Sequence, residues 1–192
     1  MQQSALGILI GGSSHVGKST LAGALARSLG RELISTDALG RHPGRPWPSL
    51  CPQVAEYYAS LTDETIHWFL KVHHENMWPR IRQIIESHRQ RAQPFVLEGA
   101  ALRPEYVAQL ESGSIIALFL HADDDFLRRR MTDEARRDET YEQKAGIIDK
   151  FIERSLRENR EMLEAARTAN IRCVDVATPG ALDALVREFS AG

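Results

Sequence analysis

Cysteine, excess charge of one sign and long apolar runs are all scarce in this chain of 192 residues. Its two cysteines, Cys51 and Cys173, show no metal-ligand spacing, which excludes a disulfide-rich scaffold and fits a reducing compartment. A formal net charge of -2 disfavours long nucleic acids as the main partner. No apolar run approaches the roughly 20 residues of a membrane span, and the first one, residues 5–10, is too short for a secretory signal. We therefore expect a cytoplasmic protein.

Hydrophobic residues make up 43% of the chain and charged residues 26%, as in an ordinary folded domain. Apolar runs that suit β-strands alternate with longer helical patterns. They occupy residues 5–10, 32–36, 94–97, 114–120 and 171–176. Because several of these runs are continuously apolar, they predict strands buried on both faces of a parallel sheet. We expect one α/β domain over residues 1–192, with three layers.

Helical periodicity covers most of the remaining chain. The predicted helices are residues 18–29, 62–91, 103–111, 123–131, 140–169 and 179–189. Pro79 is expected to kink or split the second of them. Thr178 and Pro179 fit the N-cap and first position of the last helix. The clearest loop is residues 40–48.

A phosphate-binding loop (P-loop) is the most specific motif in the sequence. Gly12, Gly17, Lys18 and Ser19 match the pattern G-x-x-x-x-G-K-[ST]. Glycines let the backbone N–H groups approach a phosphate chain, the lysine reaches the terminal phosphates, and the hydroxyl binds Mg²⁺. An apolar strand before the match and a leucine-striped helix after it argue against a chance glycine turn. The predicted nucleotide-binding residues are Gly12, Ser13, Ser14, His15, Val16, Gly17, Lys18, Ser19 and Thr20.

Two carboxylates follow predicted strands, at the edge where α/β proteins bind ligands. Asp37 ends the second strand and could take the proton of an attacking hydroxyl. Glu98 ends the third strand, and a magnesium ion would give this acid a partner. Ser19, Asp37 and Glu98 are therefore the predicted metal ligands. The alternatives are that Asp37 caps the turn after it and that Glu98 is simply exposed.

The succession of strand, GSSHVGKS, helix, strand, STD and a third strand ending in LEG resembles the P-loop small-molecule kinases. That group includes adenylate, shikimate and gluconate kinases and the zeta-toxin or chloramphenicol phosphotransferase type. The run VLEGAALRP is also similar to 2-phosphoglycerate kinase. The resemblance implies a five-stranded parallel sheet of order 2-3-1-4-5, with helices on both faces and a helical lid over residues 122–145. It further implies Mg²⁺-dependent transfer of the ATP γ-phosphate to a small acceptor, by a monomer or homodimer.

In such kinases, arginines after the fourth strand close over the transferring phosphate. Five arginines lie in the matching region, of which Arg128 and Arg130 are the predicted catalytic residues beside Lys18 and Asp37. A solvated helix face is the alternative, since neighbouring acids balance these charges. The resemblance also places the loop with Thr178 and Pro179 against the adenine, although a turn and helix cap explain those residues equally.

All three tryptophans and four of the seven histidines fall between residues 42 and 78, which suggests an acceptor-binding segment over residues 41–91. The basic and aromatic character of this segment favours an acceptor with a carboxylate or phosphate. The predicted acceptor-binding residues are Asp37, Arg41, Arg45, Trp47, His67, His74 and Glu98. The alternative is an ordinary polar helix face with core tryptophans. A zinc site is disfavoured, because Trp78 stands where an H-E-x-x-H motif starting at His74 needs its second histidine.

An ATP- and Mg²⁺-dependent kinase of a small metabolite is therefore the leading hypothesis. A regulatory NTPase switch is the alternative from another class, since residues 37–40 match a D-x-x-G pattern. The sequence contains no N-K-x-D motif for guanine, which favours ATP. A toxin-like or antibiotic-modifying phosphotransferase would share the chemistry and differ only in its acceptor.

Overall fold

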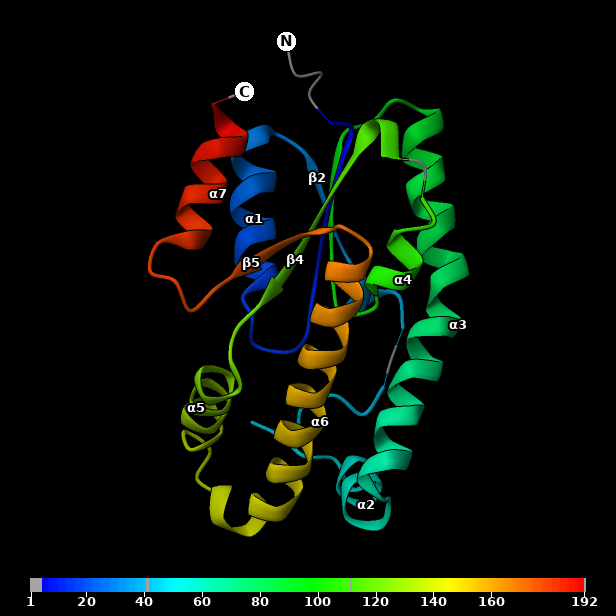
Figure 1. Cartoon of the computed structure of the whole chain (residues 1–192). Helices are drawn as coiled ribbons and strands as arrows, with labels where there is room; N and C mark the ends of the chain where they lie inside the picture. The colour runs from blue at the N-terminus through cyan, green and yellow to red at the C-terminus, as the bar shows by residue number, and fades with distance from the viewer. Residues whose placement is uncertain (1–4, 41, 111, 192) are drawn as a thin grey trace.

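A five-stranded sheet forms the centre of the protein (Figure 1). The computed structural model describes residues 5–40, 42–110 and 112–191. All strand pairs are parallel, and the order is β2-β3-β1-β4-β5. The strands are β1 (Gly7–Gly12), β2 (Glu32–Ser35), β3 (Phe95–Glu98), β4 (Ile115–His121) and β5 (Arg172–Asp175). The predicted sheet, with its order and direction, is confirmed.

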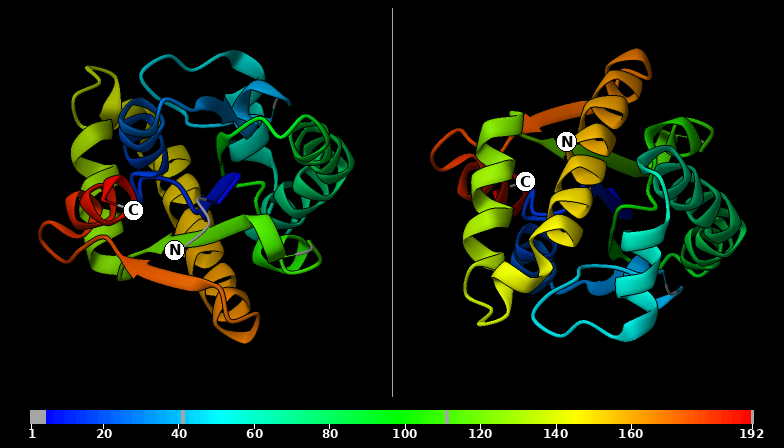
Figure 2. Two further views of the ribbon diagram at one scale, coloured as in Figure 1. Left: turned by 90° about the horizontal axis from the view of Figure 1, so that it is seen from above. Right: turned by 90° about the horizontal axis from the view of Figure 1, so that it is seen from below.

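Helices cover both faces of this sheet (Figure 2). They are α1 (Lys18–Leu29), α2 (Pro52–Ser60), α3 (Asp63–Gln90), α4 (Pro104–Val107), α5 (Asp124–Ala135), α6 (Tyr141–Thr168) and α7 (Ala181–Ser190), with short 3-10 turns η1 (Thr36–Ala38) and η2 (Ser112–Ser114). The helices α1 and α7 lie on one face, and α3 and α4 on the other. Beyond the carboxyl ends of the strands, α2, α5 and the first halves of α3 and α6 extend away from the sheet (Figure 1). These elements enclose the space next to the phosphate loop.

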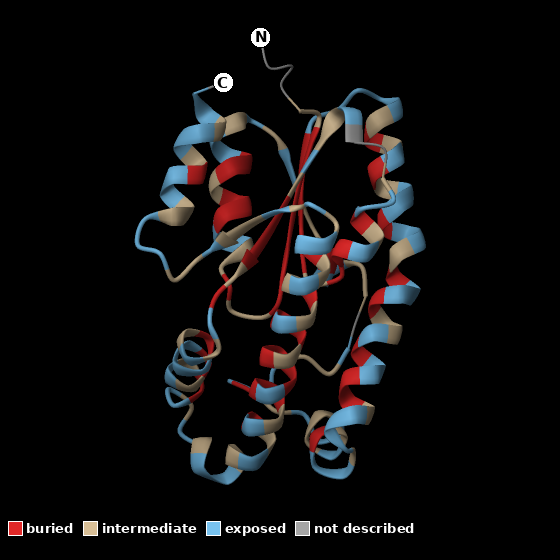
Figure 3. Ribbon diagram, in the orientation of Figure 1, coloured by how far each residue is buried: buried red, intermediate tan, exposed pale blue. Residues whose placement is uncertain are grey.

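The core divides between the two faces because successive side chains of a strand point in opposite directions. In β1, Ile8 and Ile10 pack with Leu25 of α1, whereas Leu9 packs with Ile81 of α3. Buried residues follow the central strands and the inward stripes of the helices (Figure 3). Helices therefore pack on both faces of β1. This packing fixes the position of the strand and so the position of the glycine loop that follows its C-terminal end.

The predicted start of the last helix is wrong. Gly180, with φ +75°, occupies the N-cap of α7, which begins at Ala181. Thr178 and Pro179 belong to the preceding turn, in which the N–H of Ala181 donates to the carbonyl of Thr178 at 3.2 Å. Glycine adopts the left-handed conformation of this cap without strain, which explains why Gly180 and not Thr178 is the N-cap residue.

Other helix boundaries also differ from expectation. Pro79 does not split α3, which continues through residue 90 because residues on both sides of the proline, including Met77 and Ile81, pack into the core. The predicted helix over residues 103–111 shortens to α4. Sequence periodicity missed α2, in which Tyr58 is the one buried residue. Within the described ranges, no helix is long and apolar enough to cross a membrane.

Candidate active site

The phosphate loop connects β1 directly to α1 and depends on glycine at both ends. Gly12 has φ +146°, and a Cβ there would lie 2.5 Å from the carbonyl oxygen of Leu120. Gly17 has φ +86° and is the N-cap of α1. Any side chain at Gly12 would therefore collide with the backbone of β4. The loop brings the positive end of α1 to the carboxyl edge of the sheet, where an anion would be stabilised.

Lys18 lies among three carboxylates that come from different elements. Its Nζ donates to the carbonyl of Ser13 at 2.6 Å. Burial lowers the pKa of Lys18, and the negative charges of Glu98, Asp37 and Glu158 oppose this shift. The structure thus brings together the predicted residues Lys18, Asp37 and Glu98. It adds Glu158 of α6, which sequence reasoning did not select.

A polar cavity of about 330 Å³ adjoins this lysine. Its volume lies in the range of about 300 to 1,000 Å³ that small-molecule sites occupy. Its walls come from the phosphate loop, the segment after β2, α3, the segment after β3, and α6. The lining residues are Ser14, Lys18, Thr36, Asp37, Gly40, His42, Gly44, Arg45, Leu70, His73, His74, Met77, Ala100, Ala101, Phe151, Arg154 and Glu158.

Three of the predicted acceptor residues, Asp37, Arg45 and His74, line this cavity. His74 is 2% exposed, and its burial lowers its pKa to about 2, an effect that the nearby Arg103 strengthens. This histidine is therefore neutral at physiological pH. Glu98 is buried beside Lys18 but is absent from the cavity wall. Arg41 lies outside the described residues.

Two other predicted acceptor residues are directed elsewhere. Trp47 is buried, and its ring packs edge-on against Phe151 with 5.0 Å between the ring centroids. His67 on α3 contacts Glu161 of α6 through Nε2 at 2.9 Å. The structure does not bring either side chain to the cavity, because both take part in packing between elements.

The helix α5, within the predicted lid, contacts the phosphate loop through one carboxylate. Glu134 Oε2 lies 2.9 Å from His15 Nε2, and Trp47 Nε1 donates to Oε1 of the same carboxylate at 3.3 Å. Arg45 also pairs with Glu134. Burial lowers the pKa of His15 to about 4, although Glu134 opposes this effect. A neutral His15 is therefore enclosed between the loop and α5.

The two predicted catalytic arginines of α5 are both exposed and do not line the cavity. Arg128 pairs with Glu153 at 2.7 Å, and about half of each side chain is exposed. A pair of this exposure contributes at most about 1 kcal/mol. Arg130 lies near enough to His15 to act on its pKa. Thr178 and Pro179 are exposed in the turn before α7, and their predicted contact with adenine stays a prediction.

Arg154 and Glu158 of α6 are the cavity residues that sequence reasoning missed. They are 6% and 2% exposed, one helical turn apart. Burial raises the pKa of Glu158, while Arg154 and Arg103 act in the opposite direction. Phe151 and Met162 belong to the buried apolar stripe of this long helix, and Arg154 and Glu158 lie on the same stripe between them. These two charged residues on an apolar stripe were the available signal.

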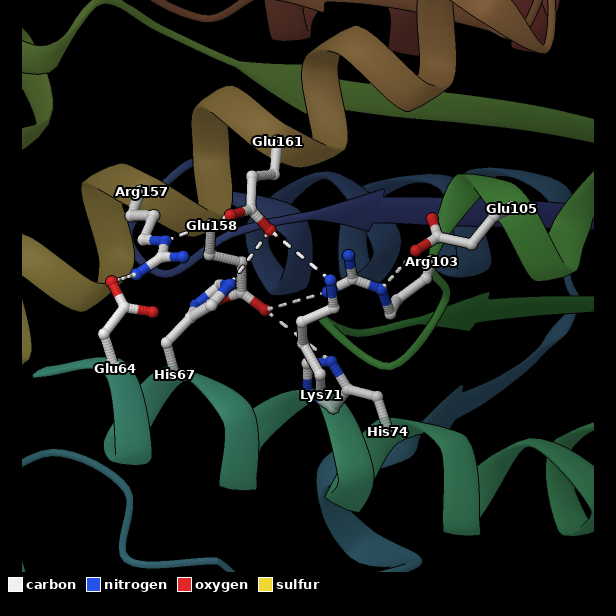
Figure 4. A network of polar contacts seen from close by, with 9 residues as sticks. All are labelled: Glu64, His67, Lys71, His74, Arg103, Glu105, Arg157, Glu158 and Glu161. Carbon is white, nitrogen blue, oxygen red and sulfur yellow. Dashed lines mark hydrogen bonds and ion pairs between the residues drawn. The ribbon is translucent and has the colours of Figure 1, made fainter.

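Glu158 stands at the centre of a polar network between α3, α4 and α6 (Figure 4). His74 Nδ1 lies 3.6 Å from its Oε1, and Arg103 Nη1 lies 4.0 Å away. Arg103 Nε also donates to Glu105 Oε1 at 2.7 Å. One turn later, Glu161 contacts His67 of α3. The network holds the cavity wall of α6 against the helices that face it.

Oxygen donors of the type that Mg²⁺ prefers are present at the phosphate loop. Ser19 is exposed in the first turn of α1, and Asp37 and Glu98 act on the adjacent Lys18. Among the described residues, no group of three or more His, Cys, Asp or Glu side chains is arranged to hold a metal ion. The donors therefore fit a magnesium ion that shares its ligands with nucleotide phosphates and water, rather than a site built from protein side chains alone.

Comparisons with known proteins agree with this geometry. A protein-family model described as an AAA domain matches residues 8–163. No curated protein matches the sequence. The fold is similar to those of a gluconokinase from Sinorhizobium meliloti 1021 (24% identity, 99% of this chain and 92% of that chain, TM-score 0.55), a shikimate kinase from Acinetobacter baumannii in complex with shikimate (18%, 97% and 91%, 0.50) and a deoxyadenosine kinase from M. mycoides with bound dATP (13%, 96% and 97%, 0.53). The structural neighbours are thus P-loop small-molecule kinases.

Proposed function

Because the chain belongs to the AAA-domain family of P-loop proteins, we propose that it is a kinase that transfers the γ-phosphate of ATP to the hydroxyl of a small anionic metabolite. One observation carries this proposal: the cavity that adjoins Lys18 contains Asp37 and Arg154 on its walls. A phosphate-handling lysine, a carboxylate that can accept a proton and a buried cation are thereby grouped around one space of small-molecule size.

Residues 12–20 would bind the phosphates of the nucleotide. The N-terminus of α1 favours negative charge, and Lys18 would exchange its contact with the carbonyl of Ser13 for phosphate oxygens. Ser19, Asp37 and Glu98 would hold Mg²⁺, directly or through water. When bound, the ion would neutralise charge on the phosphates.

Asp37 is the proposed general base. It lies in η1 at the carboxyl end of β2. The backbone N–H of Asp37 donates a hydrogen bond to Ser35 Oγ at 3.4 Å. Its carboxylate would take the proton of the acceptor hydroxyl while the acceptor oxygen bonds to the γ-phosphorus. The bond between that phosphorus and the oxygen bridging to the β-phosphate breaks, and ADP leaves with the electron pair.

Arg154 is the proposed partner of the anionic group of the acceptor. Its guanidinium stacks on the ring of Phe151 at 4.7 Å, and in the described part of the chain no carboxylate lies within 4.0 Å of it. Its Nε has no hydrogen-bond partner. Its charge acts on the buried Glu158, and its Nη2 donates to Ser155 Oγ at 3.4 Å. Because charge pairs are stronger when they are buried, an acceptor carboxylate or phosphate in direct contact would gain more here than at the solvated Arg128.

The proposed division of the chain follows from these roles. Residues 41–91 would form the acceptor-binding segment and residues 122–145 the lid of a single kinase domain. Contact of Glu134 with His15 supports a lid that meets the phosphate loop. Arg128 and Arg130 stand on the lid helix, and either would have to move toward the cavity to act on the transferring phosphate.

A panel of hydroxylated carboxylic acids and phosphate esters, assayed for ADP release with Mg²⁺-ATP, tests the proposal. We expect one acid to stimulate ADP release strongly and Lys18→Met to lower kcat/KM at least about 100-fold. Lys71→Met is the matched control, because Lys71 is about half exposed, does not line the cavity and forms a loose ion pair with Glu161 at 3.8 Å. Hydrolysis that ignores every acceptor but responds to a protein partner would instead favour a regulatory NTPase switch.

A further inference from the structure

A second cavity of about 180 Å³ adjoins the first one on the side of α2 and α3. The two cavities share four lining residues: His42, Leu70, His73 and Arg154. The remaining walls of the second cavity, which we call the annex, are Pro43, Tyr57 and Phe69. An acceptor in the main cavity would therefore have more space available than the site next to Lys18 provides.

Four of the seven residues that line the annex are apolar or aromatic, Pro43, Tyr57, Phe69 and Leu70, and the other three are His42, His73 and Arg154. The hydroxyl of Tyr57 donates to the carbonyl of Ile66 at 3.2 Å, and burial raises the pKa of this phenol, so it stays neutral and already hydrogen-bonded. The rings of Tyr57 and Phe69 lie 6.4 Å apart. Phe69 is 45% exposed and forms an outer wall. A ring in the annex would find the faces and edges of Tyr57 and Phe69 to pack against, while the polar side of the annex is formed by Arg154 and the two histidines.

Arg154 is one of the residues that belong to the walls of both cavities. Its guanidinium lines both cavities and is 6% exposed. An anionic group paired with Arg154 would thus lie between the annex on one side and Asp37 with Lys18 on the other. The annex, at about 180 Å³, is of the size of an enclosed cavity of roughly 150 Å³ that is known to bind benzene.

We propose that the acceptor is a hydroxylated organic anion that also carries an apolar ring or branched group, with the anion on Arg154, the hydroxyl toward Asp37 and the apolar group in the annex. This inference rests on the proposed kinase function for the hydroxyl, but the apolar selectivity is a separate property of binding. Compact, fully hydroxylated acids would occupy the main cavity and would make no contact with the annex.

Two acids that share the same hydroxyl and carboxylate, lactate and 3-phenyllactate, test the proposal by calorimetry. Binding is measured to the wild type with and without a non-hydrolysable ATP analogue. We expect 3-phenyllactate to bind at least about tenfold more tightly than lactate, since burial of a phenyl group in an apolar pocket is worth that or more. Phe69→Ala should reduce this preference several-fold. Leu33→Ala is the control, because Leu33 is also a large exposed apolar residue, 48% exposed, and lines neither cavity.

The outcomes separate this inference from the proposed function. Equal affinity for the two acids, including no measurable binding of either, would overturn the inference, as would a preference that Phe69→Ala leaves intact while the variant unfolds at the wild-type temperature. Transfer of labelled phosphate from ATP is followed separately. Preferential binding of 3-phenyllactate, lost in Phe69→Ala, with no transfer to any panel member would support the annex and contradict the kinase.

Discussion

Replacement of Arg154 by methionine tests a buried guanidinium of the cavity wall that forms no direct ion pair with the described residues. The side chain is 6% exposed and lies over Phe151 at 4.7 Å. Within the described residues, no carboxylate lies within 4.0 Å of the guanidinium, so Arg154→Met breaks no direct ion pair, but it removes the charge that most lowers the pKa of the buried Glu158 and the hydrogen bond to Ser155 Oγ at 3.4 Å. Methionine retains an unbranched side chain that can pack on the same ring.

The expected effect on stability is small and the expected effect on catalysis is large. Loss of the contact between the cation and the ring of Phe151 should cost about 1 kcal/mol. Loss of a buried charge pair with the acceptor should cost about 2 to 5 kcal/mol, which lowers kcat/KM for the acceptor by a factor of about 30 or more. The KM for ATP should change little, because the phosphates are assigned to the loop and to Lys18.

Steady-state kinetics with the best acceptor of the panel, together with urea denaturation, measure both effects. Arg157→Met is the control, because Arg157 lies on the same helix but pairs with Glu64 and Glu161 at the surface. We expect this control to leave kcat/KM within about twofold, as for other surface pairs. If Arg154→Met folds normally and keeps the wild-type kcat/KM, the guanidinium does not bind the acceptor.

Three further changes test the base, the strand end and the buried histidine. Asp37→Asn should lower kcat at least about 100-fold while ATP affinity in a fluorescence titration is retained, and unchanged turnover would remove the base assignment. Gly99→Ala should reduce the free energy of unfolding by about 2 to 5 kcal/mol in urea, because the new Cβ would meet Thr36 Oγ1 at 1.7 Å and φ is +149°; a loss below about 1 kcal/mol would contradict this. Burial lowers the pKa of His74 to about 2, so below about pH 6.5 the unfolded chain binds a proton that the folded chain does not. His74 should contribute about 1.4 kcal/mol per pH unit to the fall in stability as the pH drops, beside the contributions of other buried histidines such as His15 and His42. His74→Gln should reduce the slope by that amount in urea titrations at several pH values, and an unaltered slope would refute it.

The sheet was predictable because local sequence determines it. Continuous apolar runs mark β1, β3 and β4, and neighbouring residues such as Leu9 and Ile10 are buried on opposite faces of the sheet, as a parallel strand covered by helices requires. The start of α7 was not predictable from capping preferences alone. Both Thr178 and Gly180 fit helix caps, and only the path of the chain after β5 decides between them.

The phosphate loop could likewise be predicted from the sequence, because its function depends on nearby residues with fixed spacing. The acceptor cavity was not, because its walls come from five segments that are distant in sequence. His74 could be selected from its helix face, yet the same periodicity also selected His67, which lies two turns earlier on the same face and contacts Glu161, outside the cavity wall. The sequence does not distinguish Arg154 from the other charged residues of this long helix, and its burial is evident only in the folded structure.

The charges on the cavity wall limit what the acceptor can be. Lys18 is assigned to the nucleotide, and Arg45 already pairs with Glu134, which leaves Arg154 as the cation available to an acceptor anion. Asp37 and Glu158 oppose any second negative charge from the same wall. The histidines cannot compensate, because burial holds the pKa of His42 at about 4 and that of His74 lower still. An acceptor with a single carboxylate would therefore be better matched than a doubly charged phosphate ester, since one guanidinium fork satisfies one carboxylate. The proposed acceptor is therefore a hydroxycarboxylic acid.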